Sequence, residues 1–380
     1  MTDTTFSAPS QPSGGETITI TYEEKPGLGW LSIKNWLLSI LTLGIYRFWA
    51  KTDVRKHVWS SVHVNGEPLE YTGRGIELFL GAVVIFFIVF LPFAVLVNGL
   101  QLAGYPMAAL SFQFLLMFVF LALYGMAVYR ARRYRLSRTV WRGIRGGLTG
   151  SSFKYSMLYF GTILLSGVTM GWSNPAMNLE LQERITREMK FGDAPFEFRG
   201  RAGPLYARYA ACWFGSIVAY IIIAIIGVSV FFALGGTEGF QEFFKSFDKK
   251  MNDADPTAVI AFILTIFVVI GVFSAIFGVI WSFYKAREMV LFAQYTSFDN
   301  AHFRLNATGW SLVGLWFGNL LLVIFTLGIA APFTVQRMVK YFVDRLEVVG
   351  WVNVGQIMQS QQALESRGEG LMDAFDIDGI

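Results

Sequence analysis

Four long apolar segments constrain what this chain can fold into more than any other feature of its sequence. Each holds about 20 residues or more, the length that a helix needs to cross a hydrocarbon core of ~30 Å. They run roughly over residues 77–100, 107–129, 209–234 and 258–283. Across the chain 54% of the residues are hydrophobic and only 15% are charged, a balance that excludes a soluble enzyme and a disordered chain. The sequence therefore predicts a polytopic α-helical membrane protein.

The four segments form two pairs, and three further apolar segments are harder to place. A short uncharged turn at residues 104–106 joins the first pair, and a polar stretch at 235–257 joins the second. Each pair is therefore predicted to form a transmembrane hairpin. The remaining segments cover 35–46, 155–171 and 309–331. The first of these has 12 residues, so as a helix of about 18 Å it is too short to cross.

The basic residues between these segments favour a topology in which the three uncertain segments enter the membrane and return to the same side. With that arrangement 20 Lys and Arg residues of the connecting stretches lie inside and 3, all within 235–257, lie outside. If all seven segments crossed, with the N-terminus outside, 14 would lie inside and 9 outside. The positive-inside rule favours the first arrangement, with 235–257 as the main periplasmic loop. Segment 309–331 is nevertheless long enough to span, so that alternative stays open.

An internal repeat links the three uncertain segments. Residues 35–45 and 319–329 are identical at 8 of 11 positions, and 155–171 ends in a weaker form of the same Thr-x-Gly sequence. After each Thr-x-Gly the sequence predicts a charged helix with apolar residues at i, i+4 and i+8. These residues are Val54, Val58 and Val62, then Leu181, Ile185 and Met189, and finally Met338, Phe342 and Leu346. Two interpretations stay open: the stripe packs on protein, or the helix lies on the anionic cytoplasmic leaflet.

Short alternating stretches follow these helices and predict small β-hairpins on the cytoplasmic side. They lie at 62–71, 190–198 and 346–354, and the first has Asn65-Gly66 at its centre, a strong hairpin signal. Further strands are predicted upstream at 17–22, 139–144 and 301–306. The predicted organisation is a disordered tail at 1–15, repeat units with a short re-entrant helix at 16–75, 131–203 and 285–355, transmembrane hairpins at 76–130 and 204–284, and an acidic tail at 356–380.

The first copy of the repeat carries a recognisable motif. Residues 35–50 read Asn-x-Leu-Leu-x-x-x-Thr-Leu-Gly-Ile-Tyr-x-x-Trp-Ala, and an Asn-Gly hairpin and a Tyr-x-Gly-Arg sequence at 71–74 follow. This pattern resembles the YjgN-like family of bacterial inner-membrane proteins, and the resemblance covers roughly residues 16–355. It implies a location in the bacterial inner membrane. Because the family is a domain of unknown function, the resemblance supplies no substrate and no active site.

The sequence holds no recognisable catalytic or metal-binding pattern. The three histidines, His57, His63 and His302, lack any metal-ligand spacing, and Cys212 lies in an apolar stretch as a packing residue. Nucleophile and nucleotide-loop motifs are absent as well. The four long segments carry no charged residue in their interiors, which argues against an ion-coupled transporter. We therefore expect neither an enzyme nor a cofactor.

Candidate site residues come from the repeats. Asn35 and Asn319 occupy equivalent positions in the re-entrant segments, where they either hydrogen-bond backbone at a helix break or line a polar site. Gly44, Gly171 and Gly328 close the three Thr-x-Gly turns. Because a glycine after a helix commonly takes the left-handed conformation, we expect a structural role for these three.

Two Glu–Arg pairs lie at equivalent places just before long spans. They are Glu70 with Arg74 and Glu197 with Arg201, four residues apart in each case. On a strand this spacing puts both side chains on one face, which predicts a salt bridge at the membrane surface. The alternative is that each pair binds a lipid headgroup or another anion. The seven arginines at 130–145 are assigned to membrane orientation and lipid headgroups, not to nucleic acid.

These observations favour a non-enzymatic membrane module that organises lipid or recruits a partner. The alternative is a conduit or carrier for a small or lipid-like substrate, with the re-entrant segments lining the path, and an intramembrane enzyme is the weakest interpretation. The C-terminal tail interleaves five acidic residues with large apolar ones. It is predicted to be a docking peptide for a protein partner, with Leu371 and Phe375 as anchors one helical turn apart.

Overall fold

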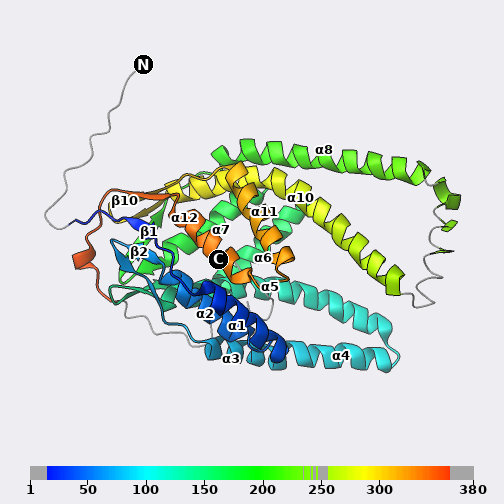
Figure 1. Ribbon diagram of the computed structural model, residues 1–380, viewed down its shortest axis with the longest axis horizontal. Helices are drawn as coiled ribbons and strands as arrows, with labels where there is room; N and C mark the ends of the chain where they lie inside the picture. Colours follow the sequence, from blue (N-terminus) through cyan, green and yellow to red (C-terminus); the bar gives the residue numbers. More distant parts are fainter. Residues whose placement is uncertain (1–14, 234, 240, 243–244, 247–255, 360–380) are drawn as a thin grey trace, which may run out of the picture. The chain divides into compact units, whose positions relative to one another are not determined.

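The computed structural model describes residues 15–233, 235–239, 241–242, 245–246 and 256–359. The chain divides into two compact units, and Figure 1 labels most of the helices and three of the strands by name, β1, β2 and β10. The first unit comprises Met1–Ala202, Val290–Asn306 and Leu315–Ile380, and the second comprises Gly203–Met289 and Ala307–Gly314. The predicted anchors Leu371 and Phe375 and nearly all of the predicted N-terminal tail lie outside the described residues.

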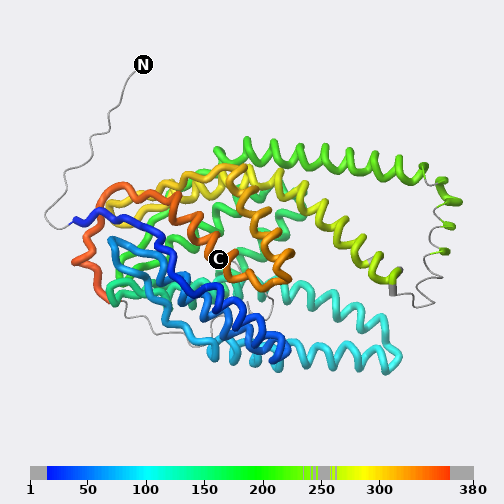
Figure 2. The backbone as a smooth tube through the Cα atoms, viewed as in Figure 1, coloured from blue at the N-terminus to red at the C-terminus, as the bar shows by residue number. Residues whose placement is uncertain are grey.

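Among the described residues, four helices are long and apolar enough to cross a membrane, as the sequence predicts. They are Gly75–Leu102, α5 (Pro106–Arg138), α8 (Gly203–Ala233) and α10 (Pro256–Tyr295). The first consists of α3 (Gly75–Ile85), a π-helical turn η1 (Phe86–Phe90) and α4 (Leu91–Leu102), through which the backbone runs without a break (Figure 2). Pro92 follows the π turn, and because proline lacks an N–H and crowds the preceding turn, the hydrogen-bond ladder widens there.

The two helices of each predicted pair pack on each other within one unit. In the first unit α4 contacts α5, and the rings of Phe93 and Phe112 stack with centroids 5.9 Å apart. In the second unit Cys212 Sγ of α8 lies 3.1 Å from the carbonyl oxygen of Ile280 in α10. Cys212 is therefore a buried packing residue between these two helices.

The helix α5 continues well beyond the apolar segment from which it was predicted. Its last three turns are held by partly buried carboxylates of other helices. Glu77 of α3 accepts hydrogen bonds from the Tyr134 hydroxyl at 2.6 Å and from the Arg138 guanidinium at 2.9 Å. Glu188 accepts a hydrogen bond from the Tyr129 hydroxyl at 2.5 Å. Part of the arginine cluster at 130–145 is therefore helical, since arginine favours helices and these contacts stabilise the extension.

Three short helix pairs correspond to the repeated segments. They are α1 (Leu28–Leu41) with α2 (Arg47–Trp59), α6 (Ser152–Val168) with α7 (Asn174–Glu188), and α11 (Gly309–Phe325) with α12 (Ala331–Val343). One Thr-x-Gly turn separates the helices of each pair. The first helix of a pair has 14 residues in α1 and 17 in α6 and α11. At 1.5 Å per residue these helices extend about 21–26 Å, less than a bilayer core requires.

The strands of all three repeats join into one ring, and two of the predicted small hairpins, at 62–71 and 190–198, form within it. The strands are β1 (Ile20–Tyr22), β2 (Val62–Val64), β3 (Glu67–Pro68), β4 (Glu70–Tyr71), β5 (Thr139–Trp141), β6 (Ile144–Leu148), β7 (Met189–Phe191), β8 (Ala194–Phe198), β9 (Thr296–Phe298), β10 (Ala301–Leu305) and β11 (Leu346–Val349). Neighbours in this order pair antiparallel from β1 to β3 and from β4 to β11, and only Leu69 separates β3 from β4. Glu16 and Val352 exchange two backbone hydrogen bonds of 2.9 Å, which close the ring.

The hairpins within the ring differ partly from those predicted. Asn65-Gly66 forms the expected tight turn, with φ of 52° and 80° and with Val64 opposite Glu67. The predicted single strands at 139–144 and 301–306 are arms of two further hairpins, β5–β6 and β9–β10. The stretch 346–354 is not a hairpin, because its backbone pairs with β10 and with Glu16 instead of folding on itself.

The inside of the ring is an apolar core of the first unit. Its buried members are Trp141, Phe298, Ala301, Val352 and Val354. A cavity of about 230 Å³ remains among these side chains. On the ring, Arg142 pairs with Glu16 at 3.0 Å and with Glu67 at 3.1 Å. The hydrogen bond to Glu16 raises the pKa of the Arg142 guanidinium.

Candidate functional site

The three Thr-x-Gly turns share one hydrogen-bond pattern. In the first turn the N–H of Gly44 donates to the carbonyl of Ser39 at 2.7 Å, and the N–H of Leu43 donates to the carbonyl of Ile40 at 3.1 Å. These two bonds define a Schellman motif, which satisfies carbonyl groups at the end of a helix. The same bonds recur from Gly171 to Ser166, from Met170 to Gly167, from Gly328 to Val323 and from Leu327 to Ile324.

Each turn has two consecutive left-handed residues, where the sequence predicts only the glycine. The φ angles are 86° at Gly44, 88° at Gly171 and 83° at Gly328. They are 51° at Leu43, 49° at Met170 and 50° at Leu327, the residues before each glycine. A residue with a side chain costs about 1–2 kcal/mol in this conformation. Sequence reasoning missed these three residues because local pattern gives no reason for a large side chain at a left-handed position.

One threonine hydroxyl in each turn makes hydrogen bonds to both helices of the pair. Thr42 Oγ1 donates to the carbonyl of Leu38 at 2.7 Å and accepts the N–H of Tyr46 at 2.9 Å. Thr169 and Thr326 make the same contacts, donating to Leu165 and Leu322 and accepting from Ser173 and Ala330. The hydroxyl therefore satisfies a carbonyl at the end of the first helix and an N–H at the start of the second.

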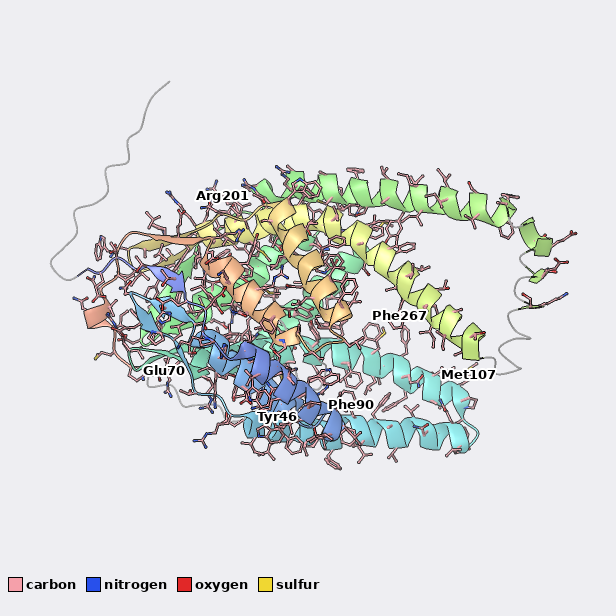
Figure 3. All side chains as sticks on the ribbon, viewed as in Figure 1. Tyr46, Glu70, Phe90, Met107, Arg201 and Phe267 are labelled. Atoms are coloured by element: carbon pink, nitrogen blue, oxygen red, sulfur yellow. The ribbon has the colours of Figure 1, made fainter. Side chains whose placement is uncertain are left out.

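The side chain at the centre of each turn is large, apolar and exposed. We call Leu43, Met170 and Leu327 the turn tips; their exposed fractions are 94%, 79% and 81%. The neighbouring residues Leu41, Val168 and Phe325 are exposed as well. Figure 3 labels Tyr46, which follows the first turn. A turn with an internally bonded backbone and an apolar tip suits hydrocarbon, where unpaired backbone groups are costly.

A pocket of about 330 Å³ lies in the first unit between the first and third repeats, and we call it the basic pocket. Its cationic residues are Arg47, Lys51 and Arg55, at i, i+4 and i+8 along α2, and Arg135 of α5. Its apolar residues include Ile329, Ala331, Pro332 and Val335, from the third turn and α12. No carboxylate of the described residues lines it. Cations and apolar surface in one pocket are what an amphiphilic anion requires.

Asn35 lines the basic pocket and has an unsatisfied oxygen. Its side chain is 3% exposed, and Nδ2 donates to the carbonyl of Ala50 at 3.5 Å. Its Oδ1 is buried and has no hydrogen-bond partner. The oxygen of Asn319 is also buried without a partner, but Asn319 does not line this pocket. The structure therefore brings Asn35 to residues of the third repeat without bringing the two asparagines to one site.

Several contacts hold the walls of the basic pocket in place. Trp36 Nε1 donates to the carbonyl of Leu327 at 3.2 Å and so ties α1 to the third turn. Lys34 and Asp53 form a salt bridge of 3.1 Å between α1 and α2. Arg55 donates to the Tyr71 hydroxyl at 3.3 Å. Sequence reasoning did not pick out this basic stripe, although the four-residue spacing of its cations on α2 was an available signal.

The structure does not form the two expected Glu–Arg pairs. Glu197 pairs with Arg199 at 3.0 Å, and no ion pair within the described ranges joins Glu70 to Arg74 or Glu197 to Arg201. The strands β4 and β8 end before Arg74 and Arg201, so the spacing argument for one strand face does not apply. All four side chains are exposed, and Figure 3 shows Glu70 and Arg201 well apart.

Metal ligands do not gather in the part of the chain that the structure describes. There, no group of three or more His, Cys, Asp or Glu residues is placed to hold a metal ion. His63 lies 3.7 Å from a carboxylate oxygen of Glu23.

The four long apolar helices place the chain in the class of multi-pass membrane proteins. Residues 29–374 match the family described as "Bacterial protein of unknown function (DUF898)". Since this match covers most of the chain, the chain belongs to that family.

The curated relatives all carry the name "Inner membrane protein YjgN". The protein of Escherichia coli strain K12 is 27% identical over 144 residues, 37% of this chain and 33% of the relative. That of Escherichia coli O157:H7 is 26% identical over 141 residues, with the same coverage of both chains. That of Salmonella typhimurium strain LT2 is 28% identical over 80 residues, 21% of this chain and 20% of the relative.

These matches span a third or less of the relatives' own length. They confirm the predicted resemblance to the YjgN-like family. Together with the four long apolar helices, they show that the chain is a multi-pass inner-membrane protein. No solved structure matches it.

Proposed function

We propose that the chain is a non-enzymatic membrane module that organises lipid in the cytoplasmic leaflet through its three turn tips. The observation that carries the proposal is repetition: the same turn occurs three times, each with the same internal hydrogen bonds and a large, exposed apolar tip. Moving such a side chain from water into apolar surroundings is worth roughly 1.5–3 kcal/mol. Three inserted turn tips would order the lipid that packs around them.

The distribution of charge supports entry of the turns from the cytoplasmic side. The helix after each turn is charged, and Arg47, Arg187 and Lys340 are examples of its basic residues. Basic residues on these helices would lie at the anionic headgroups while the turn tips reach the acyl chains. On this proposal the stretch at 235–257 faces the periplasm.

The depth of the turn tips tests the proposal. Single cysteines replace Leu43, Met170 or Leu327 in a Cys212→Ala background, and each carries a fluorophore in reconstituted full-length protein. We expect quenching by doxyl groups on lipid chains and weak quenching by iodide in water. Gln356→Cys, at an exposed position of η2 (Val354–Gln356), is the matched control and should show the reverse. The proposal is wrong if iodide quenches all three tips as strongly as position 356.

The sidedness of the chain is tested in intact cells. A membrane-impermeant maleimide should modify a cysteine at position 245 and leave cysteines at positions 190 and 345 unmodified until the membrane is opened. Modification at 190 or 345 from outside would contradict entry of the turns from the cytoplasmic side.

A conduit or carrier for a lipid-like substrate is the second candidate. The basic pocket favours it, because its cations and apolar surface are both needed to hold such a substrate. Liposomes containing the full-length chain separate the two functions. A carrier moves fluorescent lipid or a trapped solute faster than protein-free liposomes do. The membrane module leaves both rates unchanged.

A further inference from the structure

The helices that follow the three turns differ at one set of positions. In α2 these positions hold Arg47, Lys51 and Arg55, which line the basic pocket. The equivalent positions hold Asn174, Asn178 and Gln182 in α7, and Ala331, Val335 and Val339 in α12. All three helices form after the same turn, so folding of a repeat does not require cations there. The basic stripe of α2 is therefore specific to the first repeat.

We propose that the basic pocket binds a phosphate ester that carries a free hydroxyl group, the chemistry of a glycerol phosphate headgroup. Arg47, Arg55 and Arg135 present guanidinium groups, whose paired N–H donors match phosphate oxygens. Lys51 adds a fourth positive charge. Hydrogen bonds from charged groups to phosphate are stronger than neutral ones, so this residue set selects an anion.

The hydroxyl group of the proposed ligand is inferred from Asn35, whose side-chain oxygen would accept a hydrogen bond from it. Its Oδ1 is a buried acceptor without a partner, in a side chain that is 3% exposed. An amide oxygen only accepts hydrogen bonds, and a buried acceptor left unpaired is costly, so a ligand that donates to it is favoured. A choline headgroup has no N–H or O–H to donate. An ethanolamine headgroup has donors, but its ammonium is repelled by the four cations of the pocket.

The apolar residues of the basic pocket favour a lipid as the source of this headgroup. Ile329, Pro332 and Val335 offer surface on which an acyl chain would lie and which a free phosphate would leave unused. The volume of about 330 Å³ is at the lower end of small-molecule pockets, so it suits a headgroup and the start of a chain. The assignment to a membrane lipid rests on the proposed function, whereas the headgroup chemistry does not.

The role of the cations in phosphate binding is tested by native mass spectrometry. The full-length chain is mixed with phosphatidylglycerol, phosphatidic acid and phosphatidylcholine at equal concentrations. A triple variant, Arg47→Asn, Lys51→Asn and Arg55→Gln, gives α2 the residues that α7 carries. Lys56→Gln is the matched control, on the same helix but exposed and outside the pocket. We expect the triple variant to lose about tenfold or more of phosphatidylglycerol binding, and the control to keep it. Equal binding by both variants would overturn the proposal.

The hydroxyl part is tested by Asn35→Thr, because threonine is the residue at the equivalent position of the second repeat. There Thr162 donates to the carbonyl of Tyr159 at 2.6 Å. We expect the wild-type protein to prefer phosphatidylglycerol over phosphatidic acid, which lacks the hydroxyl. Asn35→Thr should reduce this preference roughly three- to tenfold, whereas Asn319→Thr should not. A wild-type protein without the preference would overturn the hydroxyl assignment.

Soluble ligands distinguish a membrane lipid from a free phosphate compound as the ligand of the basic pocket. Titration calorimetry compares glycerol 3-phosphate and inorganic phosphate on the wild-type protein and the triple variant. Glycerol 3-phosphate that binds the wild-type pocket as tightly as phosphatidylglycerol does would overturn the lipid assignment and support the headgroup chemistry. Arg135→Gln, on another helix, provides a second charge variant should the triple variant unfold.

Fluorophores at the turn tips report on the proposed function separately. If the tips prove to be in water while the triple variant still loses phosphatidylglycerol, the proposed function is wrong and the basic pocket stands. If the tips insert while lipid binding is the same in all variants, the pocket assignment is wrong and the proposed function stands.

Discussion

Replacing Gly44 with alanine tests the backbone geometry on which the turns depend. Gly44 has a φ of 86°, and a Cβ added there would meet no heavy atom within 4 Å outside its immediate neighbours. Steric contact with the rest of the fold therefore contributes nothing to the cost of Gly44→Ala. The whole cost is the left-handed backbone strain of about 1–2 kcal/mol. Gly328 has the same properties in the third turn, with a φ of 83°, so Gly328→Ala should cost a similar amount.

Gly29→Ala is the matched control, because it makes the same chemical change in the helix that leads to this turn. Gly29 lies within α1, and a Cβ there also meets nothing within 4 Å. Its backbone is helical, so alanine should stabilise the protein by about 0.5–1 kcal/mol. The two substitutions are therefore expected to have opposite signs, although they introduce the same methyl group 15 positions apart.

The assay is thermal unfolding of the full-length chain in detergent, followed by circular dichroism. A change of 1 kcal/mol moves the Tm of a domain of 150–250 residues by about 2–4 °C. Gly44→Ala should therefore melt a few degrees below the wild-type protein, and Gly29→Ala slightly above it. The reasoning is refuted if Gly44→Ala melts at or above the wild-type temperature, or if both variants shift equally in one direction.

Three further outcomes are expected. Thr326→Val removes a hydroxyl that makes hydrogen bonds of 2.6 and 3.1 Å, and should cost about 1–3 kcal/mol in the same melting assay. Glu77→Ala leaves Arg138, which is mostly buried, without its 2.9 Å ion pair and should cost about 3 kcal/mol. The exposed control Glu197→Ala should change stability by less than about 0.5 kcal/mol, and equal losses would contradict the burial argument. Deleting residues 366–380 should leave insertion and melting unchanged while removing a specific co-purifying partner; a truncated chain that keeps every partner contradicts the docking peptide.

The membrane helices and the turns were predictable because their signals are local. A run of about 20 apolar residues defines a span by length alone. Thr42 and Gly44 lie within one short segment, and the internal repeat shows that the segment matters as a unit. The left-handed residue between them has no such signal, because Leu43 is a residue type that normally avoids this conformation.

The ring of strands and the basic pocket were not predictable because they depend on distant parts of the chain. Glu70 pairs with Val140, and Glu16 pairs with Val352, yet the sequence around each residue shows only a short local strand or hairpin pattern. Alternation of side chains identifies a strand but not its partner. In the same way the cations of α2 were visible in the sequence, whereas the apolar wall comes from residues such as Val335, far along the chain.

Closure of the ring explains why the basic pocket lies where it does. In the sequence the first and third repeats are the most distant pair, but the Glu16–Val352 bridge makes their strands neighbours. Lys340 of α12 also pairs with Glu24 at 2.7 Å across the same junction. The turns need the same threonine and glycine in every copy. The faces of the helices that follow the turns are constrained only by the residues against which each helix packs. One copy could therefore become basic and another apolar, and at this junction the two faces line one pocket.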